Sequence, residues 1–329
     1  MLWGTLSGGI AAPIYSAGSR LAIDRAAAVT GFIEKRAMHV FIAGATGAIG
    51  RYLTTMLRAA GHRVTGTTRT ETGLRLLQGM GARGVRLDVY NAEAAKRAVA
   101  EAAPDAIIHQ LTALKGGTRE DNGRIRRIGT RHLVDAAKLA AVPRIITQSV
   151  AWAYGPGERP ATERDTLHYE ALPPRATLIS GIRALENISS EIEEHIILRY
   201  GLLYGPGTWY RRGGLVDDVL NDRAHDPAAL FLGDLSAAND AVSSFVHVEE
   251  AARAAADALT WPSGPVNIVD DEPAPARAWL PALAVSVGAP PPRIVSGRNA
   301  WERGADNSLA RSLGWKPHYP TWRTGFFLG

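Results

Sequence analysis

The 329-residue sequence contains no cysteine. Disulfide bonds, thiolate metal sites and a cysteine nucleophile are therefore excluded, and the absence of cysteine favours the reducing cytoplasm as the location. Lysine is also scarce. The chain has only five: Lys35, Lys96, Lys115, Lys138 and Lys316.

Long apolar runs, internal repeats and clustered charge are lacking too. The first 19 residues are uncharged, but Gly, Ser, Thr and Pro interrupt them, so they predict neither a membrane span nor a signal peptide. No unit of 20–50 residues recurs, which argues against a repeat protein. The 37 basic residues outnumber the 32 acidic ones but are scattered, with nothing longer than pairs such as Arg126-Arg127. This pattern predicts a solvated surface rather than a nucleic-acid or membrane partner.

From Met38, where we expect the folded part to begin, short apolar strands alternate with helices. This alternation predicts an α/β fold, a Rossmann-type doubly wound parallel sheet. The predicted strands are His39–Ala43, Arg63–Thr67, one reaching Asp88, Ala106–His109, Arg144–Gln148 and Ile196–Arg199. The helices that follow the first glycine-rich turn are Glu71–Met80, Ala92–Ala102, Arg127–Ala141 and Ala176–Glu194.

The alternation loosens after Gln148, and from Tyr204 onward a smaller C-terminal α/β substrate domain is expected. We therefore divide the chain into an N-terminal extension (1–37), a dinucleotide-binding domain (38–203) and a substrate-binding region (204–329) that shares some elements with the first sheet. The elements predicted in this region are helices at Leu215–Asp222, Val248–Leu259 and Arg277–Val287, and strands at Leu230–Leu232 and Val266–Val269.

The strongest motif joins the first strand to the first helix. Glycines stand at 44, 47 and 50. The first permits a tight turn, the second lets backbone approach a diphosphate, and the third allows helix and strand to pack closely. The start of the helix then offers unpaired N–H groups to the phosphates. Cofactor contacts are expected from Gly44, Thr46, Gly47, Ala48, Ile49 and Gly50.

The end of the second strand bears on the choice between NAD and NADP. No carboxylate stands there to hold a ribose 2′-hydroxyl until Glu71. Arg69 is placed instead to bind a 2′-phosphate, with Thr68 and Arg51 as helpers. The sequence therefore favours NADP, with NAD as the alternative.

Several segments together resemble the short-chain dehydrogenase/reductase superfamily, in its NAD-dependent epimerase/dehydratase group. They are the glycine loop, Asp88-Val89, Ile108-His109, Gly129-Thr130, Tyr154-Gly155, the run Arg199–Gly207, Phe245–Val248 and Leu313–Pro317. The resemblance spans nearly all of the chain after residue 37. It implies that Asp88 and Val89 lie at the adenine, and that Leu111 and Thr112 line the ribose and nicotinamide side.

The catalytic set of that family is missing. Its members use a Ser/Thr, a tyrosine and a lysine four residues after the tyrosine. No Tyr-x-x-x-Lys occurs in this sequence, and matching the helix through Glu186 places Leu178 and Ile182 at the two positions. The serine position is Val150. Candidates near the carboxyl ends of the strands are Ser149, Tyr154, Tyr204 and Tyr210. Of these, Ser149, to polarise a carbonyl, and Tyr154, to supply a proton, are retained as the catalytic pair, although Tyr154 and Tyr204 are equally suited to anchoring loops.

Other groups point to structure more than to chemistry. His109 and His247 fit packed, hydrogen-bonded imidazoles, and the aromatic residues Trp209, Tyr210 and Trp301 fit either a pocket wall or a core. Five residues resemble a metal cluster by composition but predict a solvated helix end: Asp217, Asp218, Asp222, His225 and Asp226. We predict no metal.

The leading hypothesis is an NADP-dependent oxidoreductase or epimerase/dehydratase-like enzyme acting on a small carbonyl or sugar-like molecule. The rival hypothesis is a non-catalytic NADP(H)-binding sensor, because loss of both Tyr and Lys is what such a protein would show. The partner expected in either case is a small molecule, and a homodimer is left open as the assembly.

Overall fold

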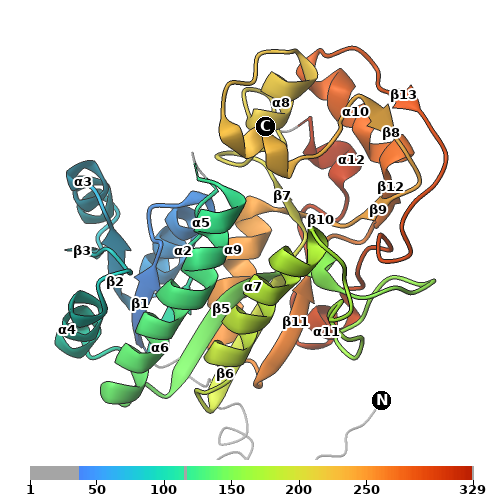
Figure 1. The fold of residues 1–329 in the computed structure, drawn as a ribbon. Coiled ribbons are helices and arrows are strands. Elements are labelled where there is room, and N and C mark those ends of the chain that lie inside the picture. Colours follow the sequence, from blue (N-terminus) through green and yellow to red (C-terminus); the bar gives the residue numbers. More distant parts are fainter. Residues whose placement is uncertain (1–36, 115–116, 328–329) are drawn as a thin grey trace, which may run out of the picture. The chain divides into compact units, whose positions relative to one another are not determined.

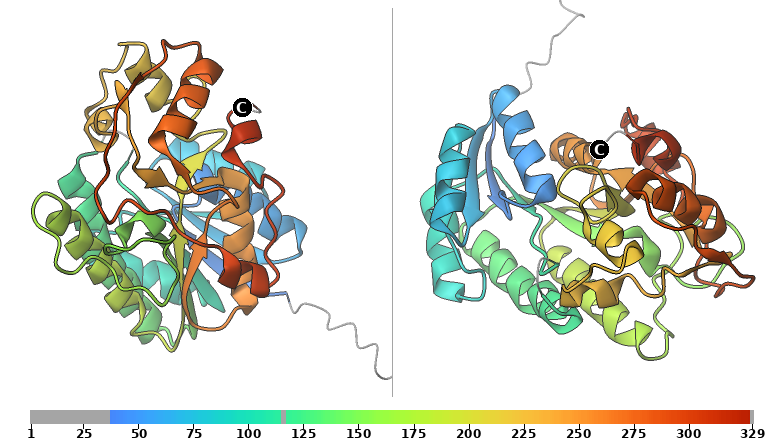
Figure 2. Two further views of the ribbon diagram at one scale, coloured as in Figure 1. Left: turned by 90° about the vertical axis from the view of Figure 1, so that its right-hand side faces the viewer. Right: turned by 90° about the horizontal axis from the view of Figure 1, so that it is seen from above.

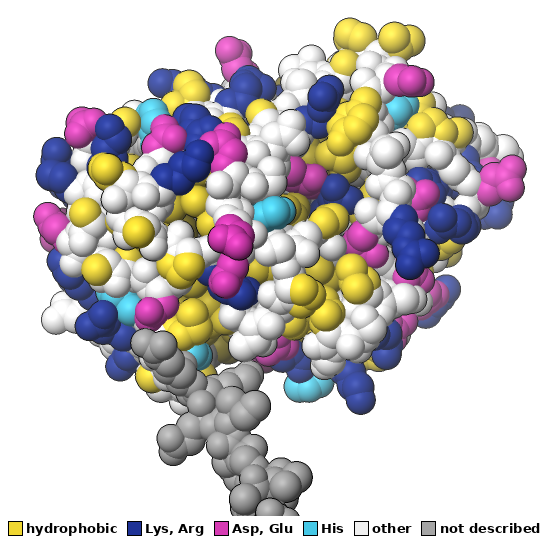
Figure 3. Space-filling view, turned by 90° about the horizontal axis from the view of Figure 1, so that it is seen from below, with side chains coloured by type: hydrophobic (Ala, Val, Ile, Leu, Met, Phe, Trp, Pro, Cys, Tyr) yellow, Lys and Arg dark blue, Asp and Glu magenta, His cyan; other side chains and the backbone are white. Residues whose placement is uncertain are grey.

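A computed structural model describes residues 37–114 and 117–327. The predicted N-terminal extension, apart from Ala37, lies outside the described residues. Within the described part, no helix combines the length and the apolar character needed to cross a membrane. Lys and Arg side chains are interspersed with Asp and Glu on the face shown in Figure 3.

The centre of the fold is a seven-stranded parallel sheet (Figure 1), which confirms the predicted doubly wound architecture. Its strand order is β11-β6-β5-β4-β1-β2-β3. The strands are β1 (His39–Ala43), β2 (Arg63–Thr68), β3 (Arg83–Arg86), β4 (Ala106–His109), β5 (Arg144–Val150), β6 (Glu194–Tyr200) and β11 (Gly264–Ile268). Strand β11 lies within residues 204–329, so the sheet includes one strand from the segment predicted as the substrate-binding region.

Helices cover both faces of the sheet (Figure 2), which is why its central strands are apolar runs without alternation. One face is packed by α2 (Ala48–Ala59), α3 (Glu71–Gly79) and α9 (Val248–Asp257). The other is packed by α4 (Ala92–Ala102), α6 (Thr130–Leu139) and α7 (Arg175–Ser189). All five residues of β1 are buried between these two layers.

Two predicted elements differ from the structure. The helix expected at 127–141 begins earlier, as α5 (Arg119–Arg124), and continues through a π-helical turn, η1 (Ile125–Gly129), into α6. Its polar start, which contains Gly123, resembles a loop in sequence, but a capping box between Thr118 and Asp121 starts a helix there. The strand expected at Leu230–Leu232 is wrong.

That segment forms a 3-10 turn, η3 (Pro227–Phe231), instead of a strand. Asp226 caps the turn by accepting a hydrogen bond from the Ala228 amide at 2.8 Å. Proline at the first position suits a helical start and cannot donate to a sheet. The cap and the proline therefore favour a 3-10 turn over the strand that the short apolar run predicted.

The rest of the chain builds a smaller region beside the carboxyl ends of the strands. Its elements are β7 (Leu202–Tyr204), α8 (Leu215–Leu220), β8 (Ala237–Ala238), β9 (Val242–Ser243), β10 (Phe245–His247), β12 (Ala274–Pro275), α10 (Ala276–Val287), β13 (Arg293–Ile294), α11 (Ser308–Ser312) and α12 (Trp322–Gly325). Short 3-10 turns follow β5 (η2, Ala151–Ala153) and α9 (η4, Ala258–Thr260). The buried Phe245 ring, 5.2 Å from Trp279 and 5.3 Å from Phe326, centres its core.

Helix α12 is docked on this core by close contacts. The Trp322 amide donates to Asp270 Oδ2 at 2.9 Å, and the Trp322 indole donates to the Glu272 carbonyl at 3.1 Å. A β-carbon on Gly325 would lie 2.2 Å from the Tyr204 ring. Only glycine therefore lets α12 approach β7 this closely.

Candidate functional site

A single large cavity lies where the carboxyl ends of the strands face the smaller region. Its volume is about 1900 Å³, against about 300–1000 Å³ for a typical small-molecule pocket. It therefore has room for a dinucleotide and a second molecule. Every residue predicted for the site lines it: Gly44, Thr46, Gly47, Ala48, Ile49, Gly50, Arg69, Asp88, Val89, Leu111, Thr112, Ser149 and Tyr154.

The glycine loop is built for close approach of backbone. Gly44 has a φ of 93°, and a β-carbon on it would lie 3.0 Å from the Gln110 carbonyl carbon. A β-carbon on Gly50 would lie 2.2 Å from the Gly44 oxygen, so this glycine lets α2 pack against the loop. The N-cap residue of α2 is Gly47, which has no side chain to occupy the amides of the first turn. These amides face the cavity and fit a diphosphate.

A basic group lies next to the loop, at the end of β2. Arg69 is exposed to the cavity and forms no hydrogen bond or ion pair with another described residue. Glu71, the first carboxylate after the strand, is not among the cavity-lining residues. The Arg51 side chain, nearby on α2, donates its Nε–H to the Thr46 carbonyl at 3.0 Å. The donor set at this end of the cavity suits an anionic group on an adenosine ribose.

The segment after β3, which the family resemblance places at the adenine, lines the cavity. Asp88 is exposed and accepts a hydrogen bond from the Tyr90 amide at 3.0 Å, while Val89 is buried beside Gly129. Leu111 and Thr112 follow β4 on the opposite side. The positions implied by the family resemblance therefore lie around one continuous cavity. The loop, the free amides of α2 and Arg69 together fit a nicotinamide dinucleotide.

Apolar side chains stand at the three positions to which the family resemblance assigns a catalytic set. Val150 and Leu178, at the serine and tyrosine positions, both line the cavity. Ile182, at the lysine position, is 1% exposed and packs in an apolar cluster with Ile179 and Leu167. None of the three side chains can donate or accept a proton.

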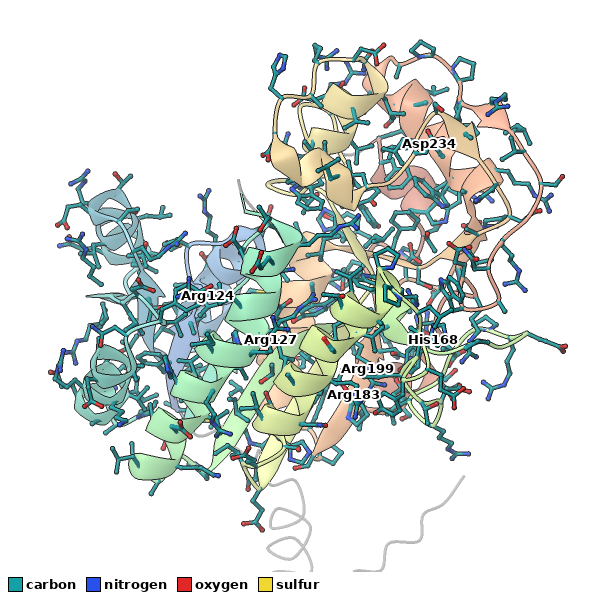
Figure 4. The ribbon with its side chains drawn as sticks, viewed as in Figure 1. Arg124, Arg127, His168, Arg183, Arg199 and Asp234 are labelled. Atoms are coloured by element: carbon teal, nitrogen blue, oxygen red, sulfur yellow. The ribbon has the colours of Figure 1, made fainter. Side chains whose placement is uncertain are left out.

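The two remaining catalytic candidates belong to one buried hydrogen-bond network. Ser149 Oγ donates to Glu186 Oε1 at 2.7 Å, and Arg199 binds both oxygens of Glu186, at 3.0 and 2.7 Å. The Arg199 Nη1 group also donates to the Tyr154 hydroxyl at 2.8 Å. That hydroxyl donates in turn to Asn267 Oδ1 at 2.7 Å. The network joins β5, β6, α7 and β11, and Figure 4 shows Arg199 beside α7.

Burial sets the protonation of this network. Burial raises the pKa of Tyr154 to about 12, against an opposing effect of the neighbouring Arg199 charge. The phenol is therefore protonated near neutral pH, and its single proton is engaged by Asn267. The catalytic roles of Ser149 and Tyr154 stay predictions, and their hydrogen bonds favour bracing the cavity wall.

His109 and His247 are buried and hydrogen-bonded, as predicted. His109 is fully buried, its Nε2 lies 3.0 Å from Thr130 Oγ1, and burial lowers its pKa to about 4. His247 Nδ1 accepts from the Glu249 amide at 3.4 Å. Tyr204 is buried in the core of the smaller region, and its hydroxyl has no hydrogen-bond partner among the described residues. Trp209, Tyr210 and Trp301 line the cavity.

The prediction of a solvated helix end at α8 is wrong for Asp217. Asp217 was predicted on a solvated helix end, but it is 5% exposed. It accepts hydrogen bonds from the Gly213 amide at 2.7 Å and from Arg223 Nη2 at 2.6 Å. It thus fastens the turn before α8. In the described residues, no group of three or more His, Asp or Glu is arranged to hold a metal ion.

Sequence reasoning missed Arg126, which it grouped with Arg127 as surface charge. Arg127 is exposed, but Arg126 is buried and lines the cavity. The π-helical turn displaces these residues from regular helical positions, and no sequence period signals such a turn.

The family model for the NAD-dependent epimerase/dehydratase family matches residues 40–269. A 3-diazoavenalumate denitrifying reductase from a Streptomyces species is 38% identical over 314 residues, covering 88% of this chain and 99% of that protein.

Solved structures match over similar lengths. The UDP-glucose 4-epimerase of Thermus thermophilus, solved with NAD, is 23% identical with a TM-score of 0.65, covering 88% of this chain and 97% of that one. The enzyme WbmH of Bordetella bronchiseptica, solved with NAD⁺, is 19% identical with a TM-score of 0.70, covering 89% and 96%. The chain therefore belongs to the NAD-dependent epimerase/dehydratase family and is an NAD(P)-dependent enzyme of the short-chain dehydrogenase/reductase superfamily.

Proposed function

We propose that this protein is an NADP(H)-dependent reductase that removes nitrogen from a diazonium compound. The observation that carries the proposal is the apolar character of the three family positions, Val150, Leu178 and Ile182. Reduction of a carbonyl needs a proton donor close to the oxygen. A reduction that needs no such proton suits these positions better than the carbonyl or sugar chemistry favoured from the sequence.

The chemistry of a diazo group agrees with this setting. When bound, the reduced nicotinamide supplies a hydride. A diazonium cation, R–N₂⁺, that receives a hydride becomes R–H and N₂, and the balance of atoms and charge requires no proton. The C–N bonding pair leaves with N₂, and the hydride pair forms the new C–H bond. The similarity to a denitrifying reductase, which covers almost all of that protein, supports this substrate class.

The preference for NADP rests on Arg69. It lies at the end of β2, beside Thr68, has no acidic partner among the described residues, and lines the same cavity as Arg51 on α2. An unpaired guanidinium makes strong, charge-assisted hydrogen bonds with a phosphate. Arg69 is therefore proposed to bind the 2′-phosphate, while the α2 amides hold the diphosphate.

Ser149 and Tyr154 are proposed to hold the reaction chamber in shape rather than to transfer protons. The reaction chamber is the part of the cavity lined by Ser149, Val150, Trp152, Tyr154 and Leu178. Through Glu186 and Arg199 they fix the end of β5 against α7 and β6. The buried charges of Glu186 and Arg199 pair with each other, which offsets the cost of removing them from water.

Turnover assays test the proposal. The full chain is incubated with NADPH and 4-carboxybenzenediazonium, and NADPH oxidation and N₂ release are followed against a protein-free control. We expect equal amounts of NADP⁺ and N₂ above the control rate, and no turnover of a panel of aldehydes, ketones and UDP-sugars. Reduction of the carbonyl panel without N₂ release would overturn the proposal. NADPH binding without any turnover would instead support the sensor hypothesis.

A further inference from the structure

The cavity contains a buried arginine that has no partner. Arg126 lies in η1 and is 7% exposed. Within the described parts of the chain, its side chain forms neither a hydrogen bond nor an ion pair, although it lines the cavity. Burial lowers the pKa of its guanidinium to about 10, so the group stays charged near neutral pH. An unpaired buried charge is costly, and its five N–H donors need acceptors.

The backbone that holds Arg126 has an unusual form. Residues Ile125–Gly129 make a π-helical turn between α5 and α6. Such turns are rare and frequently mark functional sites, because they turn a side chain away from its regular helical direction. The neighbouring Arg124 and Arg127, labelled in Figure 4, are both exposed. The buried position of Arg126 is therefore particular to that residue.

Its neighbours place Arg126 beside the reaction chamber. The turn η1 packs against α7, and Arg126 Cδ would lie 3.7 Å from a β-carbon built on Gly181. Gly181 is adjacent in sequence to Ile182, at the lysine position, and stands three residues after the cavity-lining Leu178. The family's lysine position on α7 is thus apolar, while the cationic side chain of Arg126 comes from η1, which packs against α7.

The same chamber has aromatic walls. Trp152 and Trp301 line the cavity, and Arg175 lies over both rings, 5.9 and 5.3 Å from their centroids. Arg175 is itself held by hydrogen bonds to His168 and to the Trp152 and Tyr154 carbonyls. Flat aromatic surfaces that line the same cavity as a buried cation suit a flat molecule that ends in an anion.

We propose that Arg126 binds the carboxylate of an aromatic acid and so selects anionic aromatic substrates. The inference rests on the proposed function, since it names the substrate class of the same chamber. Bidentate hydrogen bonds from the guanidinium to the carboxylate would pair the buried charge and would fix the direction of the aromatic ring within the cavity.

The test is a binding measurement that needs no turnover. The full chain, saturated with NADP⁺, is titrated by calorimetry with 2-naphthoate and with its neutral analogue 2-naphthamide. We expect naphthoate to bind roughly tenfold or more tightly than the amide, because a charge-assisted hydrogen bond contributes this much. Arg126→Gln should abolish the preference, Arg126→Lys should keep part of it, and the matched exposed control Arg127→Gln should keep all of it.

Three results would overturn the inference. One is equal or undetectable binding of both probes by the wild-type protein at millimolar concentration. Another is a preference that survives in Arg126→Gln. The third is a loss of NADP⁺ affinity in Arg126→Gln with the probe preference unchanged, which would assign Arg126 to the cofactor. Failure of diazonium turnover with an intact probe preference would refute the proposed reaction but not the anion site.

Discussion

Replacing Tyr154 by phenylalanine separates a structural role of this side chain from a catalytic one. The variant loses the hydrogen bond to Asn267 Oδ1 and the one from Arg199 Nη1. A neutral hydrogen bond contributes about 1 kcal/mol and one to a charged group about 1.5–3 kcal/mol. Because both partners remain buried, we expect the free energy of unfolding to fall by about 3 kcal/mol, with kcat nearly unchanged in the folded protein.

Urea denaturation followed by tryptophan fluorescence measures the loss of stability, and single-turnover reduction measures the chemistry. Tyr169→Phe is the matched control, because the Tyr169 ring is 54% exposed and no hydrogen bond of its hydroxyl is lost. A Tyr154→Phe protein of wild-type stability whose kcat is lower by about a hundredfold or more would refute the reasoning. Tyr154 would then be the proton donor.

Three further predictions concern the cofactor and the pH dependence of stability. Arg69→Ala should weaken NADPH binding by roughly tenfold or more while leaving NADH binding unchanged, as measured by cofactor fluorescence; equal losses for both would contradict a 2′-phosphate site. Gly50→Ala should abolish NADPH binding, because its β-carbon would lie 2.2 Å from the Gly44 oxygen, whereas Gly79→Ala, with open space around it, should bind normally. Burial raises the pKa of Asp270 from 3.8 to about 8. Its protonated form is therefore favoured by folding, and its contribution to stability is present below about pH 4 and lost as the pH rises through about 8. Urea midpoints at pH 5 and pH 8 should differ more in the wild-type protein than in Asp270→Asn; identical pH dependence in both would contradict this assignment.

The sheet could be predicted from sequence because its central strands β1 and β4 are apolar runs and the strands β1 to β4 are each followed by a helix. His39–Ala43 and Ala106–His109 were predicted with the bounds that the structure has. The glycine loop could also be predicted, because a tight turn, close approach of a diphosphate and close helix packing require glycines at a fixed spacing, and glycines stand at 44, 47 and 50. The early start of α5 was not predicted, because a capping box within a polar run gives no hydrophobic period.

The network around Tyr154 lay beyond sequence reasoning for a different reason. Tyr154 meets Arg199, 45 residues away, and Asn267, 113 residues away, and both contacts depend on how β6 and β11 pair. Nothing local to Tyr154 distinguishes a phenol held by such partners from one that faces a substrate. The burial of Arg126 depends in the same way on packing between η1 and α7.

The docking of α12 constrains when the protein can fold. Phe245 and Tyr204 stay partly uncovered until Trp322 and Phe326 arrive, about 80 and 120 residues later in synthesis. During translation the sheet can assemble as far as β6 while the aromatic core of the smaller region is still open to water. A nascent chain stalled before α12 should therefore be a substrate for chaperones, and the aromatic core of the smaller region should be complete only once synthesis has passed Phe326.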